Sequence, residues 1–204
     1  MDMSNVGADL FGHADAAVLR VLAVQGRPVT GREVAKLAGA NQSSTQRALN
    51  RWVTIGVLNA ARAPHAALYT LNRDHVLWAP LEAILAAPAR IEQEIGELVR
   101  ERTQGRATVA IFGSVARRDS SALSDIDIAL IVPDDQDPLQ IEGLVDELRE
   151  RVESLSGNEA QIVEVSERQL RNMVAHADPL AKSWAEEAHT LAGTSLSSLI
   201  AAAK

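Results

Sequence analysis

The sequence predicts an α/β (α+β) protein in two parts, and three observations support this. Apolar residues recur at helical spacing through most of roughly the first 60 residues, and two short strand patterns follow them. Strand and helix patterns then alternate in the last hundred or so residues, which indicates a small mixed sheet flanked by helices. A long helical pattern, bent or broken at Pro88, separates the two parts. We therefore expect domains at 1–78 and 105–204, with connecting helices at 79–104.

The composition is that of a globular protein, with 47% hydrophobic and 23% charged residues. Cysteine is absent, which excludes disulfides and thiolate zinc sites. No signal peptide and no apolar run of membrane-spanning length is evident, so we expect a cytoplasmic protein with no membrane partner. Residues 1–80 hold 8 Lys and Arg against 5 Asp and Glu, whereas residues 81–204 hold 12 against 22. The basic first part suits nucleic acid, and the acidic second part repels it unless a metal or local arginines intervene.

Cap residues delimit three helices in the first part. We expect them at 15–25 after Asp15, at 30–38 after Thr30, and from Asn41 or Ser43 to about Ile55. Two short strands follow at 58–61 and 67–71, joined by a loop at 62–65.

Three helices, a tight turn and a hairpin resemble the winged helix-turn-helix of bacterial transcription regulators, and the segment TGREVAKLAGANQSSTQRALNRWVTIGVL is similar to theirs. The resemblance implies that the third helix enters the major groove of operator DNA and that the hairpin touches the backbone. The side chains that would then contact base edges or phosphates are Ser43, Ser44, Gln46, Arg47, Arg51 and, near the hairpin tip, Arg62. The alternative is a helical interaction domain with a solvated face.

The segment 109–132 carries the candidate chemistry. An apolar strand ends at Gly113 and Ser114, and the next strand carries Asp125 and Asp127. Residues i and i+2 of a strand share a face, so we expect two carboxylates side by side. Such a pair favours a hard divalent cation, Mg2+ or Mn2+, between its members. Backbone N–H groups at the turn, with the Ser114 hydroxyl, can hold a phosphate.

These residues, together with Ala116 and Arg117, resemble the signature of nucleotidyltransferases related to DNA polymerase beta, especially the minimal nucleotidyltransferases of bacteria and archaea. Arg118 stands where that family usually has glycine. The resemblance implies Mg2+-dependent transfer of NMP from an NTP to a hydroxyl, with Asp125 and Asp127 as metal ligands and catalytic residues. The implied nucleotide-binding residues are Gly113, Ser114, Arg117, Arg118 and Ser124.

A third carboxylate usually lies on a strand beside these aspartates in the family, where it completes a second metal position or acts as a base. Glu164 is the acidic residue within the strand expected at 161–165, and it is the candidate for this catalytic role. An alternative register puts Gln161 there, which would compromise catalysis, and Glu159 is a weaker substitute. The remaining helices are expected at 139–155, 167–176, 179–189 and 191–203.

The acceptor hydroxyl cannot be read from these residues. The resemblance implies a protein acceptor, such as a cognate toxin, or a small molecule, and an antitoxin that represses its own operator would combine both domains. The alternative is a non-catalytic DNA-binding regulator whose second domain senses a nucleotide or a partner. A module that only dimerises is a third reading: the apolar stripe of the helix at 81–102 suits a homodimer, although intramolecular packing is the commoner explanation.

Overall fold

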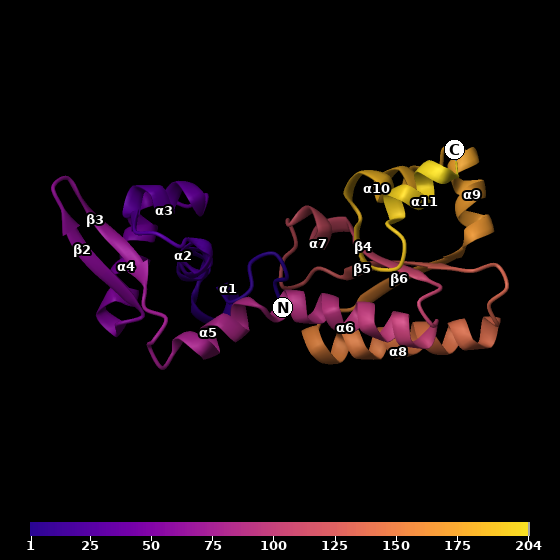
Figure 1. The fold of residues 1–204 in the computed structure, drawn as a ribbon, viewed down its shortest axis with the longest axis horizontal. Coiled ribbons are helices and arrows are strands. Elements are labelled where there is room, and N and C mark those ends of the chain that lie inside the picture. The colour runs from indigo at the N-terminus through magenta and orange to yellow at the C-terminus, as the bar shows by residue number, and fades with distance from the viewer. Residues whose placement is uncertain (204) are drawn as a thin grey trace. The chain divides into compact units, whose positions relative to one another are not determined.

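Helices and strands alternate along residues 1–203, the part of the chain that the computed structural model describes (Figure 1). The chain divides into two units with separate hydrophobic cores, one from Ser4 to Ala87 with Asp2, and one from Pro88 onward with Met1 and Met3. Both units combine helices with a small sheet, as the sequence predicts. Within residues 1–203, no helix has the length and apolar character needed to cross a membrane.

The first unit holds a three-stranded antiparallel sheet in the order β1-β3-β2. Its core joins Leu19 and Leu22 to Leu49, Trp52 and Tyr69. Its elements are α1 (Ala8–Phe11), α2 (His13–Val24), β1 (Val29–Thr30), α3 (Gly31–Leu37), α4 (Gln42–Ile55), β2 (Leu58–Ala63), β3 (Ala66–Leu71) and α5 (Trp78–Leu85).

Local chemistry explains where these helices begin and end. The Thr30 side chain accepts the N–H of Glu33 at the start of α3, and the Asn41 side chain accepts the N–H of Ser43 at the start of α4. Gly56, with a φ of 90°, ends α4 in the left-handed conformation that glycine tolerates. Asp15, by contrast, does not cap α2, which starts at His13. The expectation for this residue was wrong, because its side chain is buried and forms an ion pair with Arg51 of α4.

The second unit contains a four-stranded mixed sheet in the order β6-β5-β4-β7. Strands β5 and β6 are parallel, and the pairs β4–β5 and β4–β7 are antiparallel. Its elements are α6 (Ala87–Arg102), β4 (Thr108–Phe112), α7 (Gly113–Arg117), β5 (Ile126–Val132), α8 (Pro138–Ser156), β6 (Ala160–Ser166), α9 (Glu167–Ala175), α10 (Pro179–Glu187), β7 (His189–Ala192) and α11 (Leu196–Ala202).

Helices cover both faces of this sheet, α6 and α8 on one and α9 to α11 on the other (Figure 1). In β5, Ile128 and Leu130 face α6 and α8, whereas Ala129 and Ile131 face Trp184 of α10. This two-sided burial explains the continuous apolar run of the strand. The apolar stripe of α6 is also buried in this core, so it packs within its own unit.

The break expected at Pro88 is present: α5 and α6 are separate helices, and Pro88 lies in the first turn of α6, where its missing N–H breaks no helical hydrogen bond. One boundary differs from that expected. The last helix is shorter than 191–203, because His189–Ala192 forms strand β7 and pairs with β4. Four residues carry too short a pattern to reveal a strand without its partner.

Candidate functional site

The aspartate pair lies where β5 begins. Asp127 is the second residue of that strand and pairs in register with Phe112, the last residue of β4. Asp125 immediately precedes the strand. The side chain of Asp125 is exposed and that of Asp127 is partly buried. The antiparallel pairing therefore brings Asp127 to the point where β4 ends and the Gly-Ser turn starts.

The Gly-Ser turn is in close contact with Asp127. Gly113 has a φ of +68°, and a Cβ placed on it would lie 2.1 Å from Oδ2 of Asp127. Only a residue without a side chain fits so close to the carboxylate. Ser114 follows in the first turn of α7, and its hydroxyl has no hydrogen-bond partner among residues 1–203. The structure thus brings together Gly113, Ser114 and Asp127, and it leaves the hydroxyl available to a ligand.

Several groups act on the charge of Asp127. Burial raises the pKa of its carboxyl, the Asp125 and Glu187 carboxylates raise it further, and Arg117 opposes them. A cation between Asp125 and Asp127 would relieve this repulsion, and carboxylate oxygens are the donors that Mg2+ prefers. No set of three or more acidic or histidine side chains within residues 1–203 is placed to hold a metal ion. Two carboxylates, with the other positions filled by phosphates and water, still match how Mg2+ is commonly bound.

The third carboxylate is not where the sequence predicts it. In the parallel pair β5–β6, Asp127 lies beside Gln161, and Glu164 lies beside Leu130. Register neighbours in a sheet share a face, and Leu130 packs against α6 and α8, on the face opposite Asp127. Glu164 is therefore separated from the aspartates, and an amide takes the position of the expected carboxylate. Sequence alone left both registers open, because only strand pairing decides between them.

Arg117 lies next to the aspartates, held by two carboxylates. Its Nη1 donates to Oε2 of Glu187 at 2.9 Å, and its Nε donates to Oδ2 of Asp119 at 3.3 Å. Glu187 is the last residue of α10 and was not anticipated as a site residue. No pattern in the sequence distinguishes it from its neighbours, because only the packing of α10 against α7 brings it here.

Two predicted nucleotide-binding residues are placed less favourably. Arg118 directly follows α7 with a φ of +62°, and its side chain is exposed. This left-handed conformation favours glycine, the residue that the resemblance to the family led us to expect here. The Ser124 hydroxyl accepts the N–H of Ser121 at 2.9 Å and lies 3.2 Å from the Ser121 hydroxyl. It shapes the loop before the aspartates.

In the first unit, two residues predicted to contact DNA form hydrogen bonds within the protein. The Gln46 amide donates to the Tyr69 hydroxyl at 2.8 Å and to Asn50 at 2.9 Å. Arg51 donates to Asp15 at 3.1 Å, and the Asp15 side chain is only 7% exposed. Both side chains are thus tied to the fold, and neither is directed freely at a partner.

The other four predicted DNA contacts differ among themselves. Ser43 and Ser44 donate their hydroxyls to Asn41, at 2.7 and 2.8 Å, and so belong to the cap of α4. Arg47 on α4 and Arg62 on β2 are exposed and bind no acceptor within the described part of the chain. Of the six predicted contacts, these two arginines are the ones whose charge remains available to a partner.

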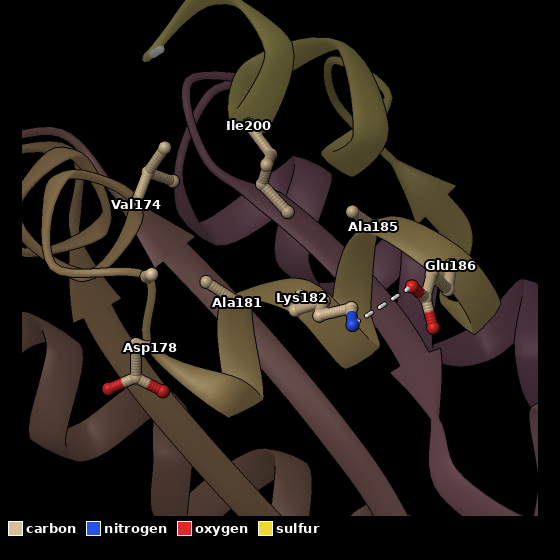
Figure 2. A pocket seen from close by; sticks show the side chains of 8 residues that line it. Val174, Asp178, Ala181, Lys182, Ala185, Glu186 and Ile200 are labelled. Atoms are coloured by element: carbon tan, nitrogen blue, oxygen red, sulfur yellow. Dashed lines mark ion pairs between the residues drawn. The ribbon is translucent and has the colours of Figure 1, made fainter.

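A separate cavity of about 420 Å3 lies among α9, α10 and α11. Figure 2 shows Val174 and Ile200 beside it, with Lys182 and Glu186 forming an ion pair. Its lining includes neither of the aspartates nor the Gly-Ser turn. It is therefore distinct from the site at the start of β5.

Residues 93–177 match the protein family described as polymerase beta, nucleotidyltransferase. The matched segment runs from within α6 to just beyond α9. The aspartate pair and the Gly-Ser turn lie inside it, whereas Glu187 lies beyond it. No curated protein matches the sequence.

Two solved structures are similar to this chain. One is described as a crystal structure of a toxin-antitoxin with AMP-PNP, is 20% identical, covers 55% of this chain and 82% of its own, and has a TM-score of 0.41. The other is described as a mutant of the toxin-antitoxin MntA-HpeT and is 18% identical. The match covers 55% of this chain and 82% of that chain, with a TM-score of 0.39.

Proposed function

We propose that the second unit is an Mg2+- or Mn2+-dependent nucleotidyltransferase that transfers NMP from an NTP to a hydroxyl. One observation carries this proposal: Asp125 and Asp127 lie at the Gly-Ser turn inside a polymerase beta nucleotidyltransferase domain. The aspartates supply the cation ligands, and the unpartnered Ser114 hydroxyl, with the N–H groups of the turn, supplies donors for the terminal phosphates. Arg117 adds a positive charge beside them.

The reaction is an in-line displacement at the α-phosphorus. The acceptor oxygen forms a bond to this phosphorus, and the bond to the β-phosphate oxygen breaks, so that pyrophosphate leaves with the electron pair. The bound metal would neutralise charge that develops on the phosphoryl oxygens. Gln161 beside Asp127 cannot take the proton of the acceptor hydroxyl, so this proton passes to an aspartate of the pair or to water.

The test is nucleotide transfer with a labelled NTP. Wild-type protein with Mg2+ and each of the four α-labelled NTPs is expected to release pyrophosphate and to label an acceptor in its host lysate. Asp125→Asn with Asp127→Asn should abolish both, because the cation ligands are lost. The matched control is Asp135→Asn with Asp146→Asn, which removes two exposed carboxylates outside the proposed site. Equal activity in the aspartate variant, or no transfer from any NTP, would reject the proposal.

The second candidate is a nucleotide sensor without transfer, which the position of Gln161 favours. Such a protein binds Mg2+ and NTP and leaves the NTP intact. Calorimetry would then show saturable binding that requires Asp125 and Asp127, with no pyrophosphate released. Gln161→Glu tests whether the missing third carboxylate is what prevents catalysis. If it is, this variant should gain nucleotide-transfer activity.

For the first unit we propose a winged helix-turn-helix that binds operator DNA. Its order of elements supports this: α2, α3 and α4 precede the hairpin β2–β3, and β1 pairs with β3. Arg47 on α4 and Arg62 near the hairpin tip are the proposed DNA contacts. Arg47→Ala with Arg62→Ala should weaken retention of the protein's own promoter DNA and lower its salt slope by about 2. Arg90→Ala with Arg149→Ala removes the same charge from the other unit and should leave retention unchanged.

The proposed acceptor is a hydroxyl on a partner protein of the toxin class, in keeping with the likeness of the Gly-Ser and aspartate signature to minimal nucleotidyltransferases.

A homodimer with two-fold related first units would suit a palindromic operator. Light scattering with and without DNA measures the molar mass and therefore the oligomeric state. A monomer in both conditions would reject the dimer.

A further inference from the structure

Glu187 lies outside the nucleotidyltransferase family match but binds Arg117 of α7, the helix that begins at the Gly-Ser turn. It is the last residue of α10, and β7 begins two residues later and pairs with β4. That pairing carries the end of α10 toward Gly113, where β4 also ends. Glu187 is thus placed by the C-terminal segment of the unit.

The Glu187 carboxylate accepts two hydrogen bonds, from the Arg117 guanidinium at 2.9 Å and from the Ser183 hydroxyl at 2.5 Å. The Ser183 hydroxyl, with Arg117 and the Gly113 N–H, holds the pKa of Glu187 below its usual range. Its side chain is 19% exposed. A carboxylate at a helix C-terminus is opposed by the helix dipole, so these donors fix it in that position.

The Arg117 donor lies at the end of α7. Gly113 begins this short helix and Arg117 ends it, and Ser114 lies between them. The Glu187 carboxylate therefore holds the C-terminal end of the element that carries the proposed phosphate-binding hydroxyl. The Glu187 charge also acts on Asp127, next to which Gly113 is packed.

We infer that Glu187 is a positioning residue of the nucleotide site, which holds Ser114 and Arg117 in place for the NTP phosphates. This inference rests on the proposed function, since it names a residue that the nucleotide site needs from outside the family domain. Glu187 acts through Arg117 and does not itself contact the nucleotide.

The test compares Glu187→Gln with Glu186→Gln in the full-length protein. Both variants remove one negative charge from the end of α10, but Glu186 pairs with Lys182 beside the separate cavity (Figure 2). Calorimetry with ATP and Mg2+ is expected to show Kd about tenfold higher for Glu187→Gln and unchanged for Glu186→Gln. Arg117→Gln should raise Kd similarly, and adding Glu187→Gln to it should raise Kd little further, because the two act as one unit.

The outcomes separate this inference from the proposed function. If the wild type binds ATP and Glu187→Gln binds it with an equal Kd, the positioning role is overturned. A lower Kd in Glu187→Gln would also overturn it and would show that the carboxylate competes with phosphate for the donors. Wild type that binds no NTP would reject the proposed function, and amide exchange of the free protein then tests the positioning role. The Arg118 N–H donates to the Val115 carbonyl at 3.1 Å, at the end of α7 that Glu187 holds through Arg117. Exchange of this amide at least about tenfold faster in Glu187→Gln than in Glu186→Gln supports the positioning role, and equal exchange overturns it.

Discussion

Gly113 lies so close to Asp127 that a Cβ on the glycine would be 2.1 Å from Oδ2 of the aspartate. This contact joins the end of β4 to the start of β5. It makes the Gly-Ser turn and the aspartate pair one structural unit, although 13 residues separate Gly113 from Asp127.

Gly113→Ala should destabilise the protein by about 3 kcal/mol, because it adds backbone strain at positive φ and a clash with a carboxylate. The change in the free energy of unfolding is measured by urea denaturation. Gly157→Ala is the matched control, since Gly157 has a φ of +72° and open space around it. It should cost about 1 kcal/mol, from backbone strain alone. Equal costs at the two positions would show that the Asp127 contact carries no energy.

Asp127→Asn should raise the free energy of unfolding near neutral pH. The pKa of Asp127 in the folded protein is raised, first by burial and then by Asp125. The folded state therefore binds more protons than the unfolded state between the two pKa values, and wild-type stability falls as pH rises through that window. Below the unfolded value of about 3.9 both states are protonated, and the advantage of the variant should vanish.

Urea denaturation of wild type and Asp127→Asn across this pH range measures the effect, with Asp135→Asn as the exposed control. Saturating Mg2+ should stabilise wild type and not Asp127→Asn. A variant less stable than wild type at neutral pH would contradict the burial of an unfavourable charge.

Arg51→Gln should destabilise the first unit by about 2 kcal/mol, because it leaves the buried Asp15 carboxylate without its cation. Burial raises the pKa of Asp15, and Arg51 lowers it. A double-mutant cycle with Asp15→Asn measures the coupling. Additive effects would mean that the pair contributes nothing, and Arg51 would again be a candidate for DNA contact.

Arg118→Gly should stabilise the protein by about 0.5 kcal/mol. Arg118 has a φ of +62°, where a side chain costs about 1 kcal/mol, and the greater freedom of glycine in the unfolded chain offsets part of the gain. Arg118→Ala keeps the Cβ and should match wild type in its melting temperature. If alanine and glycine gave the same stability, the left-handed backbone at this position would not favour glycine.

Much of the fold could be predicted from local patterns. The caps at Thr30 and Asn41, the helix end at Gly56 and the apolar strands around the aspartates follow from side-chain chemistry within a few residues. Asp125 and Asp127 were found for the same reason, because carboxylates two residues apart on a strand share a face.

Residues whose roles depend on distant partners were predicted poorly. Arg51 and Gln46 look like exposed polar residues of a helix, yet Asp15 and Tyr69 engage them. Strand β7 is recognisable only through its pairing with β4.

The sequence by itself determined the motif, its two aspartates and the order of helices and strands, since these depend on neighbouring residues. Tertiary structure alone decided that Gln161 and not Glu164 lies beside Asp127, and that Glu187 binds Arg117 at the end of α7. The physical reason is that strand register and helix docking are set by the packing of a whole core. No single residue in the chain encodes either one.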